Sequence, residues 1–296
     1  RRPQPVVTTV PEQVVAEPAT PGPTQPPATS PPRNPAPGPQ IIRVEPGASL
    51  PTNRGIVVRD PSALGQNLRV AHLPDRDLIE ETPDGPLPVR AADGRRPMDV
   101  YARPWSGARG ARIAIVIGGF AISQTGTQAA IQSLPPEVTM AFSPQGNSIN
   151  RWMQAARQKG HEILMQVPLE PFDYPNVDPG RNTLTVDSSP DENLRKLHWA
   201  LSRTTNYTGV MNFMGALFLA DGAAMQPIFA DLGKRGLLYL DDGSSARSTA
   251  PEVALSNGVA FAAGDGQIDA TRDRGAILKK LDELERIARA KGYAIG

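Results

Sequence analysis

The residues best suited to chemistry are acids and amides that come at or just after the predicted strands. Glu170 follows the strand expected at Ile163–Val167, and Asp241 and Asp242 close the strand expected at Leu237–Asp242. Two carboxylates facing each other across a cleft can hydrolyse a glycosidic bond, so Glu170 with Asp241 or Asp242 is one candidate catalytic pair. The polar residues considered at the strand ends are Glu170, Asp173, Asn212, Asp241, Asp242, Ser244, Ser245, Arg247 and Asp265.

These polar residues have two further interpretations. In the first, they line a cleft that grips a glycan or a peptide, with Tyr174 or Phe213 as a stacking surface for a sugar ring. In the second, Asp-Asp-Gly-Ser-Ser (241–245) is only a turn, because Asp, Gly and Ser favour turns wherever they occur. The residues themselves leave both interpretations open.

A pair of glycines closes the first regular strand. Arg112–Phe120 is a continuous apolar run that ends in Gly118 and Gly119, and such a run predicts a fully buried parallel strand. Function in parallel α/β folds gathers at the carboxyl ends of the strands. Glycine offers no ligand, acid or base, so this position indicates a catalytic architecture that has lost its catalytic groups.

Strands and helices alternate from Ala111 onward, which predicts a parallel sheet, open or closed into a (β/α) barrel. The apolar strands are expected at Ile113–Gly118, Val138–Phe142, Ile163–Val167, Gly209–Phe213, Leu237–Asp242 and Val259–Gly264. Helices are expected at Ser148–Gly160, from Ser189 to about Tyr207, at Asp221–Arg235 and at Thr271–Lys291. Tyr293–Gly296 resembles the start of another strand, which indicates a barrel without its last βα unit.

The N-terminal third has a different character. Residues 1–40 are rich in proline and predict a disordered, semi-rigid linker rather than a packed core. An SH3-type ligand is the alternative for this tract. Residues 41–110 predict an extended arm or small segment, with short strands at Ile41–Val44 and Gly55–Arg59 and a turn-rich stretch, 88–104, over the main domain. The main domain is expected to be 111–296.

Composition excludes several classes of function. The formal net charge of +1 argues against a nucleic-acid groove or a polybasic membrane patch. The sequence has no cysteine and only three histidines, which excludes thiol chemistry, iron–sulfur clusters and histidine-rich metal sites. No apolar run is long enough to span a membrane. Because the chain begins Arg-Arg-Pro, we expect a fragment whose anchor or signal precedes Arg1.

Several blocks together are similar to the divergent polysaccharide deacetylase family, relatives of the NodB-type carbohydrate esterases. The resemblance covers Arg112 to Gly296 and is specific as a set. Its blocks are Ile-Ala-Ile-Val-Ile (113–117), Leu-Glu-Pro-Phe-Asp-Tyr-Pro-Asn-Val-Asp-Pro-Gly (169–180), Asn-Leu-Arg-Lys-Leu-His-Trp-Ala-Leu-Ser-Arg (193–203), Gly-Val-Met-Asn-Phe-Met-Gly (209–215) and Gly-Leu-Leu-Tyr-Leu-Asp-Asp (236–242). It implies an irregular (β/α) barrel.

The resemblance also implies a metal site whose ligands this chain lacks. Metal-dependent members end the first strand in Asp-Asp, where this chain has Gly118 and Gly119. They place a histidine before the Pro-x-Glu-Pro block and another in the fourth strand, where this chain has Gln166 and Phe213. A zinc site needs three protein ligands and an open position for water. We therefore expect no metal and no other cofactor.

The leading hypothesis is a metal-less pseudoenzyme of the bacterial cell envelope, periplasmic and held at the inner membrane by a segment outside this chain. It would bind a glycan or peptidoglycan fragment, or regulate envelope polysaccharide metabolism, with an envelope protein as a further partner. The alternatives are an active carbohydrate deacetylase or hydrolase that uses the remaining carboxylates, and a protein-binding scaffold. The expected ligand-binding residues are Gly118, Gly119, Gln166, Glu170, Asp173, Tyr174, Asn212, Phe213, Asp241, Asp242, Ser244 and Arg247.

Overall fold

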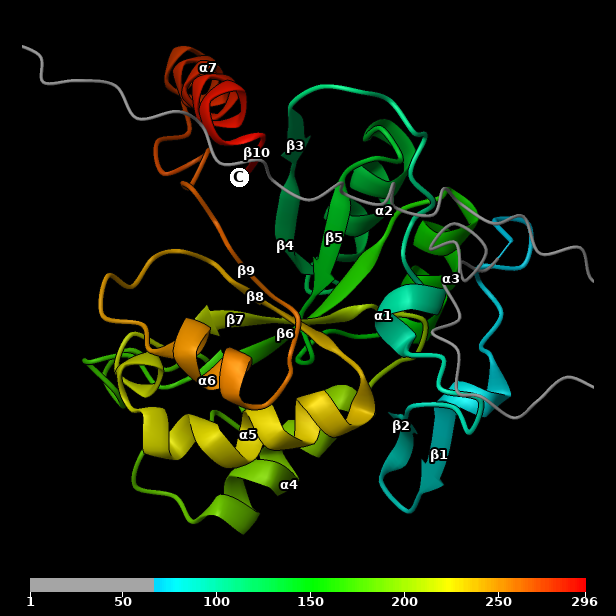
Figure 1. The fold of residues 1–296 in the computed structure, drawn as a ribbon, viewed down its shortest axis with the longest axis vertical. Helices are drawn as coiled ribbons and strands as arrows, with labels where there is room; N and C mark the ends of the chain where they lie inside the picture. Colours follow the sequence, from blue (N-terminus) through cyan, green and yellow to red (C-terminus); the bar gives the residue numbers. More distant parts are fainter. Residues whose placement is uncertain (1–66) are drawn as a thin grey trace, which may run out of the picture. The chain divides into compact units, whose positions relative to one another are not determined.

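The computed structural model describes residues 67–296, which belong to one compact unit. The linker expected at 1–40 and the strands expected at Ile41–Val44 and Gly55–Arg59 lie outside the described residues. The described part has a mixed α/β fold with a six-stranded parallel sheet and seven α-helices (Figure 1). No helix in this part combines the length and the apolar character that a membrane span requires.

The central sheet follows the order of the sequence, and every neighbouring pair of strands is parallel. Its strands are β4 (Val116–Phe120), β5 (Thr139–Phe142), β6 (Ile163–Leu169), β7 (Gly209–Met214), β8 (Leu238–Asp241) and β9 (Phe261–Ala263). In such a sheet all the carboxyl ends lie along one edge, where ligand sites of α/β folds form. The segments that follow the strands therefore meet at that edge.

A second, two-stranded parallel sheet joins β3 (Arg112–Ala114) to β10 (Tyr293–Ile295). The predicted strand at the end of the chain therefore forms. Asp265, just after β9, approaches β10 as well: its N–H donates to the carbonyl of Ile295 at 2.7 Å, and its Oδ2 accepts the N–H of Ile295 at 2.8 Å. Closure of the whole sheet into a barrel stays a prediction.

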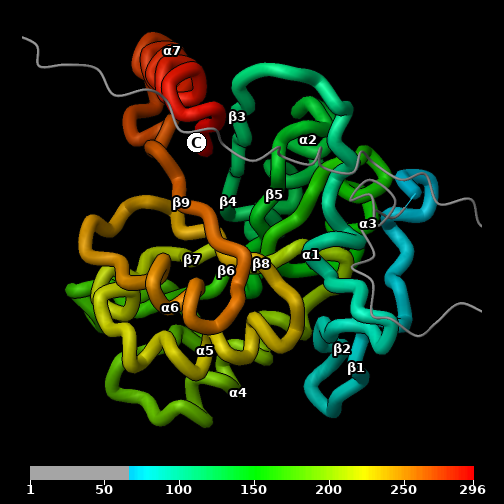
Figure 2. Tube along the Cα trace, in the orientation of Figure 1, coloured from blue at the N-terminus to red at the C-terminus, as the bar shows by residue number. Residues whose placement is uncertain are grey.

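The main hydrophobic core lies between the sheet and the helices that connect its strands. Met165 and Val167 of β6 pack there with Trp152, Leu197 and Phe229, which come from three different helices. Figures 1 and 2 show α4 and α5 running together along one side of the sheet, while α7 lies beside β10 and β3. The helices of this region are α2 (Gln124–Ser133), α3 (Ile149–Gln158), α4 (Pro190–Leu201), α5 (Gly222–Arg235), α6 (Ala250–Ser256) and α7 (Arg274–Lys291).

The sequence predicts the start of α4 better than its end. Ser189 caps the helix, because its side chain accepts the N–H of Glu192 as a capping residue should. The helix stops at Leu201, short of the predicted Tyr207. Side chains take up carbonyls of its last turn, because the hydroxyl of Ser202 donates to the carbonyl of Trp199 and the hydroxyl of Tyr207 donates to that of Leu201. Asn206, further along, has a left-handed backbone with φ 64° and donates its side-chain amide to two carbonyls of the N-terminal arm.

The N-terminal arm forms a hairpin and a short helix that contact the main domain. Its elements are β1 (Ile79–Thr82), β2 (Gly85–Pro88) and α1 (Pro97–Val100), with β1 and β2 antiparallel. Arg235, at the end of α5, donates to the carbonyl of Pro88 at 3.0 Å. The N–H of Met98 donates to the carbonyl of Gly236 at 3.3 Å. The arm is therefore fastened to the end of α5.

The opposite face of the sheet has its own, smaller core. Ala141, Leu164 and Leu240 come from three strands and are buried together. Successive side chains of a strand point to opposite faces, so Leu164 and Gln166 share this inner face, while Met165 faces the helices. Gln166 therefore stands above the inner core, toward the carboxyl edge.

The first strand differs from its prediction. The segment predicted as one fully buried strand is divided into β3 and β4, and Ile113, Ile117, Gly118 and Gly119 are exposed. The physical reason is position: β4 is the first strand of the six-stranded sheet, and α7 contacts this region through Ile115. Apolar sequence alone does not tell whether a neighbouring element covers a strand.

Besides the short α1 of the arm, the sequence analysis did not predict the helices α2 and α6. In α2 only Thr127 and Ile131 are buried, so the buried face has too few residues to give a clear hydrophobic periodicity in the sequence. The helix is nevertheless well started, because the side chain of Ser123 accepts the N–H of Gly126. The short α6 begins with proline in its first turn and buries Val253.

Candidate functional site

The glycine pair and Gln166 form one hydrogen-bonded unit at the carboxyl edge of β4 and β6. The backbone N–H of Gly119 donates to Oε1 of Gln166 at 2.8 Å. A Cβ added at Gly118 would lie 2.7 Å from Nε2 of the same side chain, closer than atoms in a folded protein pack. The amide of Gln166 therefore takes the space that a side chain at position 118 would need.

Phe213 lies on the same face of the sheet as Gln166. Pro168 of β6 is paired with Phe213 of β7, and Gln166 comes two residues before Pro168, so the two side chains point to the same side. Phe213 is 39% exposed, while Gln166 is only 5% exposed. The three positions singled out by the resemblance thus share one inner face, with a polar amide below and an aromatic ring above.

Asn212 and Asp241 are placed differently. By alternation along their strands they share the helix-facing side with Val210 and Tyr239, which belong to the main core. Oδ1 of Asn212 accepts the N–H of Asp242 at 2.8 Å, and its Nδ2 donates to a carbonyl of its own strand end. Asn212 therefore joins the ends of β7 and β8.

The carboxylate of Asp241 is buried and fully engaged. Its Oδ1 accepts the N–H of Gly243 at 2.9 Å, and its Oδ2 accepts the hydroxyl of Ser248 at 2.6 Å. These partners hold the loop between β8 and α6. A carboxylate used in this way supports the loop rather than a reaction.

Asp242 makes a local turn. Its Oδ1 accepts both the N–H and the hydroxyl of Ser244, at 2.9 and 2.6 Å, which is the turn chemistry expected of Asp-x-Ser. Asp242 is half-buried, and Ser244 and Arg247 are exposed in the same loop. The turn interpretation therefore accounts for the side-chain bonds of Asp242.

Glu170 supports a neighbouring loop. Its Oε2 accepts the N–H of Val186 at 2.7 Å, and its backbone carbonyl accepts two N–H groups at the start of the turn after β7. It is 7% exposed. Asp173 and Tyr174 follow it in an exposed loop. The structure does not bring Glu170 and Asp241 together as a pair joined by a hydrogen bond.

The sequence interpretation missed an apolar rim around this edge. The rim residues lie at the end of β7 or in the loops after β4 and β6, and are 36% to 62% exposed: Phe213, Met214, Ile122, Phe172, Tyr174 and Val177. Of these, only Tyr174 and Phe213 were candidate contacts. The others are also apolar residues that lie next to a predicted strand end or in the loop that follows one.

The residues at this site do not fit a zinc ion. Zinc is bound by Cys, His, Asp or Glu, and the three positions hold glycine, glutamine and phenylalanine. Within residues 67–296 no group of three or more such side chains is arranged to hold a metal. His161 lies before β6 and its Nδ1 is 2.8 Å from the carbonyl of Val138, and His198 of α4 pairs with Asp231.

Two acids with shifted pKa values lie away from the glycine pair. Burial raises the pKa of Glu162, which precedes β6 at the opposite, amino end of the strand. Burial also acts to raise the pKa of Asp265, but hydrogen bonds from Lys291 and from the N–H of Ile295 outweigh it and lower that pKa. Neither group lies at Gly118, so neither shift tunes a reaction there.

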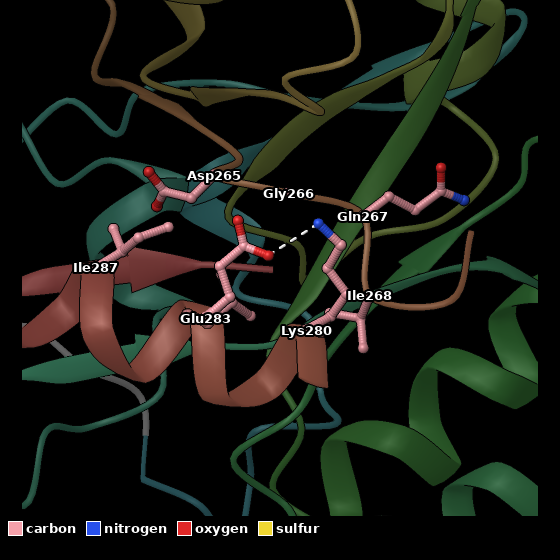
Figure 3. Close-up of a pocket in the computed structure, with 8 residues that line it drawn as sticks. Asp265, Gly266, Gln267, Ile268, Lys280, Glu283 and Ile287 are labelled. Atoms are coloured by element: carbon pink, nitrogen blue, oxygen red, sulfur yellow. Dashed lines mark hydrogen bonds and ion pairs between the residues drawn. The ribbon is translucent and has the colours of Figure 1, made fainter. Parts of the chain in front are cut away.

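A small pocket opens beside α7, and it shares no residue with the glycine site. It lies between the loop after β9 and α7, and Lys280 and Glu283, both on α7, form an ion pair of 2.9 Å along its helical wall (Figure 3). Asp265, at its border, already bonds Ile295 and Lys291. The pocket therefore belongs to the contact between α7 and the sheet.

Comparison with curated proteins finds relatives in Escherichia coli and in Haemophilus influenzae. The uncharacterized protein YibQ of Escherichia coli is 23% identical over 184 residues, which cover 62% of this chain and 57% of that protein. An uncharacterized protein of Haemophilus influenzae is 24% identical over 186 residues, which cover 62% of this chain and 65% of that protein. This chain thus spans less than two thirds of the length of these curated relatives.

A solved structure is similar in fold and sequence. The crystal structure of the uncharacterized protein ATU2773 from Agrobacterium tumefaciens matches with a TM-score of 0.71 and 55% identity, over 72% of this chain and 86% of that chain. The family model of divergent polysaccharide deacetylases matches residues 115–296, from the strand that carries the glycine pair to the last residue. Because this match covers more than half of the sequence, the chain belongs to the divergent polysaccharide deacetylase family.

Proposed function

We propose that this protein binds carbohydrate at the carboxyl edge of its sheet without a metal ion, as a pseudoenzyme of the bacterial cell envelope. The hydrogen bond between Gly119 and Gln166 carries the proposal. The resemblance expects an acid at the glycine pair and a histidine at position 166. In this chain the amide of Gln166 stands there instead, and it is already hydrogen-bonded to the backbone N–H of Gly119. Such a position has no base to activate water and no ligand set for zinc.

The groups that remain suit binding. Phe213, 39% exposed, offers an aromatic face on the inner side of the sheet, and Tyr174, in the loop after β6, and Met214, at the end of β7, are further exposed apolar side chains. The apolar face of a sugar ring packs well on such surfaces, while a few polar groups fix its orientation. The proposed frame is an irregular (β/α) barrel, with the bonds between Asp265 and Ile295 linking β9 to β10.

We place this activity in the periplasm, in envelope polysaccharide or peptidoglycan metabolism. The description of the family, which names polysaccharides, supports this choice of ligand. The ligand would be a glycan or a peptidoglycan fragment. An envelope protein would be the partner that responds when this ligand binds.

An active hydrolase has less support. It needs two carboxylates that face a common substrate and are free to exchange protons. Glu170 and Asp241 instead hold the loops at Val186 and Ser248. A hydrolase would have to break these bonds to use them.

Calorimetric titration of the purified protein with chitotetraose and with peptidoglycan fragments tests the proposal. We expect binding without turnover, unchanged by EDTA, and weakened in Phe213→Ala. The matched control is Leu255→Ala, which removes an apolar side chain that is 84% exposed on α6. Release of acetate, or a stoichiometric zinc ion in the protein, would overturn the proposal.

A further inference from the structure

We propose that the amino end of the β3–β10 pair carries a second binding surface, which docks on a bilayer that contains anionic phospholipids. This surface, the amino-end patch, consists of Trp105, Arg109, Arg112, Lys291 and Tyr293. It lies at the amino end of β3, whereas the glycine pair lies at the carboxyl end of β4, the next strand of the chain. The inference therefore goes beyond the proposed carbohydrate binding and does not depend on it.

Two segments far apart in the sequence meet in the amino-end patch. Tyr293 begins β10 and is the register partner of Arg112, which begins β3. Register partners on neighbouring strands carry their side chains on the same face of the sheet. The guanidinium of Arg112 lies 4.9 Å from the centre of the Trp105 ring. The loop before β3 therefore contributes to the same surface as the two strands.

The two aromatic rings of the patch are open to solvent. Trp105 is 55% exposed, Tyr293 is 52% exposed, and residues 104–114 are all exposed. Large exposed apolar side chains that gather in one place indicate a contact with another molecule or with a membrane. Tryptophan and tyrosine are enriched at the boundary between hydrocarbon and headgroups, because one end of each ring is apolar and the other is polar.

A cation lies against each ring. Nζ of Lys291 is 4.4 Å from the centre of the Tyr293 ring, as the guanidinium of Arg112 is close to Trp105. These contacts hold a positive charge beside an aromatic face. Each pair can therefore place its ring at the boundary of the bilayer while its charge stays among the headgroups.

The two segments that form the patch carry charge of one sign. Residues 100–114 contain three arginines, residues 286–296 contain two arginines and one lysine, and neither segment contains Asp or Glu. Lys291 pairs with Asp265, but Arg109 and Arg112 form no ion pair among residues 67–296. The net charge of +1 for the whole chain does not predict this local excess.

Charge complementarity identifies the occupant as an anionic surface. Each arginine or lysine close to such a membrane strengthens binding about fivefold. A stable protein partner would need about 800 Å² on this side, with an apolar centre free of charge. Two exposed rings, each with a cation against it, instead match the layered boundary of headgroups and hydrocarbon.

Docking through this end has a consequence for the other end. β3 leads directly into β4, and Gly119 comes seven residues after Arg112 in the chain. An extended run of this length spans about 20 Å. The docked protein would therefore hold the carboxyl edge of its sheet away from the bilayer, open to the space beyond it.

Co-sedimentation of the full chain with lipid vesicles tests the proposal. The wild-type protein should sediment with vesicles of phosphatidylglycerol and phosphatidylcholine in equal parts, and not with vesicles of phosphatidylcholine alone. Binding should be lost between ionic strengths of about 0.01 M and about 1 M, because the Debye length shortens from about 30 Å to about 3 Å. Trp105→Ala should weaken binding about tenfold, and Arg112→Gln about fivefold.

Matched controls change similar side chains elsewhere. Leu255→Ala removes an apolar side chain that is 84% exposed on α6, and Arg195→Gln removes an exposed charge from α4. Both variants should bind the anionic vesicles as the wild-type protein does. Phe213→Ala should also bind them normally, since Phe213 lies at the end of β7. This last variant distinguishes the patch from the proposed carbohydrate site.

The wild-type protein gives a second readout if Trp105→Ala or Arg112→Gln folds poorly. Anionic vesicles whose acyl chains carry bromine should quench the tryptophan emission, because bromine quenches a ring that reaches the hydrocarbon. Trp152 is only 4% exposed and Trp199 lies on α4 between Arg181 and Arg203, so the quenched ring should be Trp105.

Three results would overturn the proposal. In the first, the protein binds neither kind of vesicle, or binds both equally. In the second, it binds anionic vesicles but neither Trp105→Ala nor Arg112→Gln weakens the binding, and brominated lipid quenches no emission. In the third, a soluble acidic polymer such as polyglutamate binds at the patch while vesicles do not, which would make an acidic protein the partner. None of these results bears on glycan binding at the carboxyl edge.

Discussion

The side chain of Gln166 and the backbone of Gly119 are joined by a hydrogen bond of 2.8 Å that needs a glycine beside it, at position 118. Any side chain at 118 would collide with the Gln166 amide, and a change at 166 would leave the N–H of Gly119 without its acceptor. The two strands β4 and β6 are not hydrogen-bonded neighbours, since β5 lies between them. The contact therefore fixes the carboxyl edge across an intervening strand.

Replacing Gly118 by alanine should weaken ligand binding more than it weakens the fold. The added Cβ meets the far end of a flexible side chain, so the Gln166 amide can swing away. The lost hydrogen bond costs about 1 kcal/mol, which the smaller freedom of alanine in the unfolded chain partly offsets. Urea denaturation should show a change within about 1 kcal/mol, while glycan affinity falls about tenfold.

The control for that change is Gly266→Ala, because a Cβ at Gly266 would meet no atom within 4 Å. It should leave both stability and affinity unchanged. A loss of affinity in the control as large as in Gly118→Ala would show that the effect is not local to Gln166.

Removing metal ions should change neither stability nor binding. Within the described residues no cluster of His, Cys, Asp or Glu could hold a metal, and the expected ligand positions carry none of these types. We expect the thermal midpoint to move by less than about 1 °C after EDTA treatment or zinc addition, because a ligand stabilises only the state that binds it. A rise of several degrees with zinc would contradict this.

Removing the carboxylate of Asp241 should destabilise the protein. Asp241→Ala leaves the N–H of Gly243 and the hydroxyl of Ser248 without their acceptor in a partly buried place. We expect a loss of about 2–3 kcal/mol in the free energy of unfolding. Asp242→Ala should cost less, about 1 kcal/mol, because its bonds to Ser244 are exposed. Equal costs would mean that burial does not distinguish the two acids.

The ion pairs of Asp231 should make stability depend on acid pH. Burial acts to raise the pKa of Asp231, but the hydrogen bonds from His198 and Arg235 outweigh it and lower the pKa below its ordinary value of 3.8. A carboxyl with a lowered pKa stabilises the fold above its unfolded pKa and loses that contribution as the pH falls through the folded value. Asp231→Asn should therefore be less stable than wild type at pH 7, and the difference should shrink below about pH 4.

Thermal unfolding from pH 7 down to about pH 3 measures this difference. Asp282→Asn, at an exposed position of α7, is the control and should follow the wild-type curve. A gap between Asp231→Asn and wild type that persists unchanged at the lowest pH would contradict the assignment.

Much of the fold could be predicted because local signals and packing agree there. β6 and β7 are mainly apolar and lie in the middle of the sheet, and their predicted bounds are within two residues of those observed. The same signals predicted that β4 is fully buried, which is wrong. The burial of a strand at the edge of a sheet depends on which other elements pack against it, and its own sequence does not show this. The same signals also missed α2, whose stripe of buried residues is too narrow to stand out.

The sequence predicts where the site lies, but it does not predict which hydrogen bonds the site residues make. Alternation along the strands and the resemblance together place Gly118, Gln166 and Phe213 on one side of the sheet. The bond from Gly119 to Gln166 depends on the register of three strands, which no single segment contains. The loop-supporting roles of Glu170 and Asp241 are hidden from the sequence in the same way. The partner of Glu170 is Val186, which lies far along the chain, and the partner of Asp241 is Ser248, which lies in a loop without a regular sequence pattern.

The pairing of β10 with β3 has a consequence for how the molecule is made. Residues 112–114 of β3 pair with residues 293–295 of β10, so a growing chain leaves β3 without this partner strand until β10 has been synthesised. Contacts between segments so far apart slow folding and lengthen the exposure of unpaired strand edges. A chaperone that shields β3 during synthesis would therefore speed the recovery of folded protein more than one that acts on the hairpin of the arm.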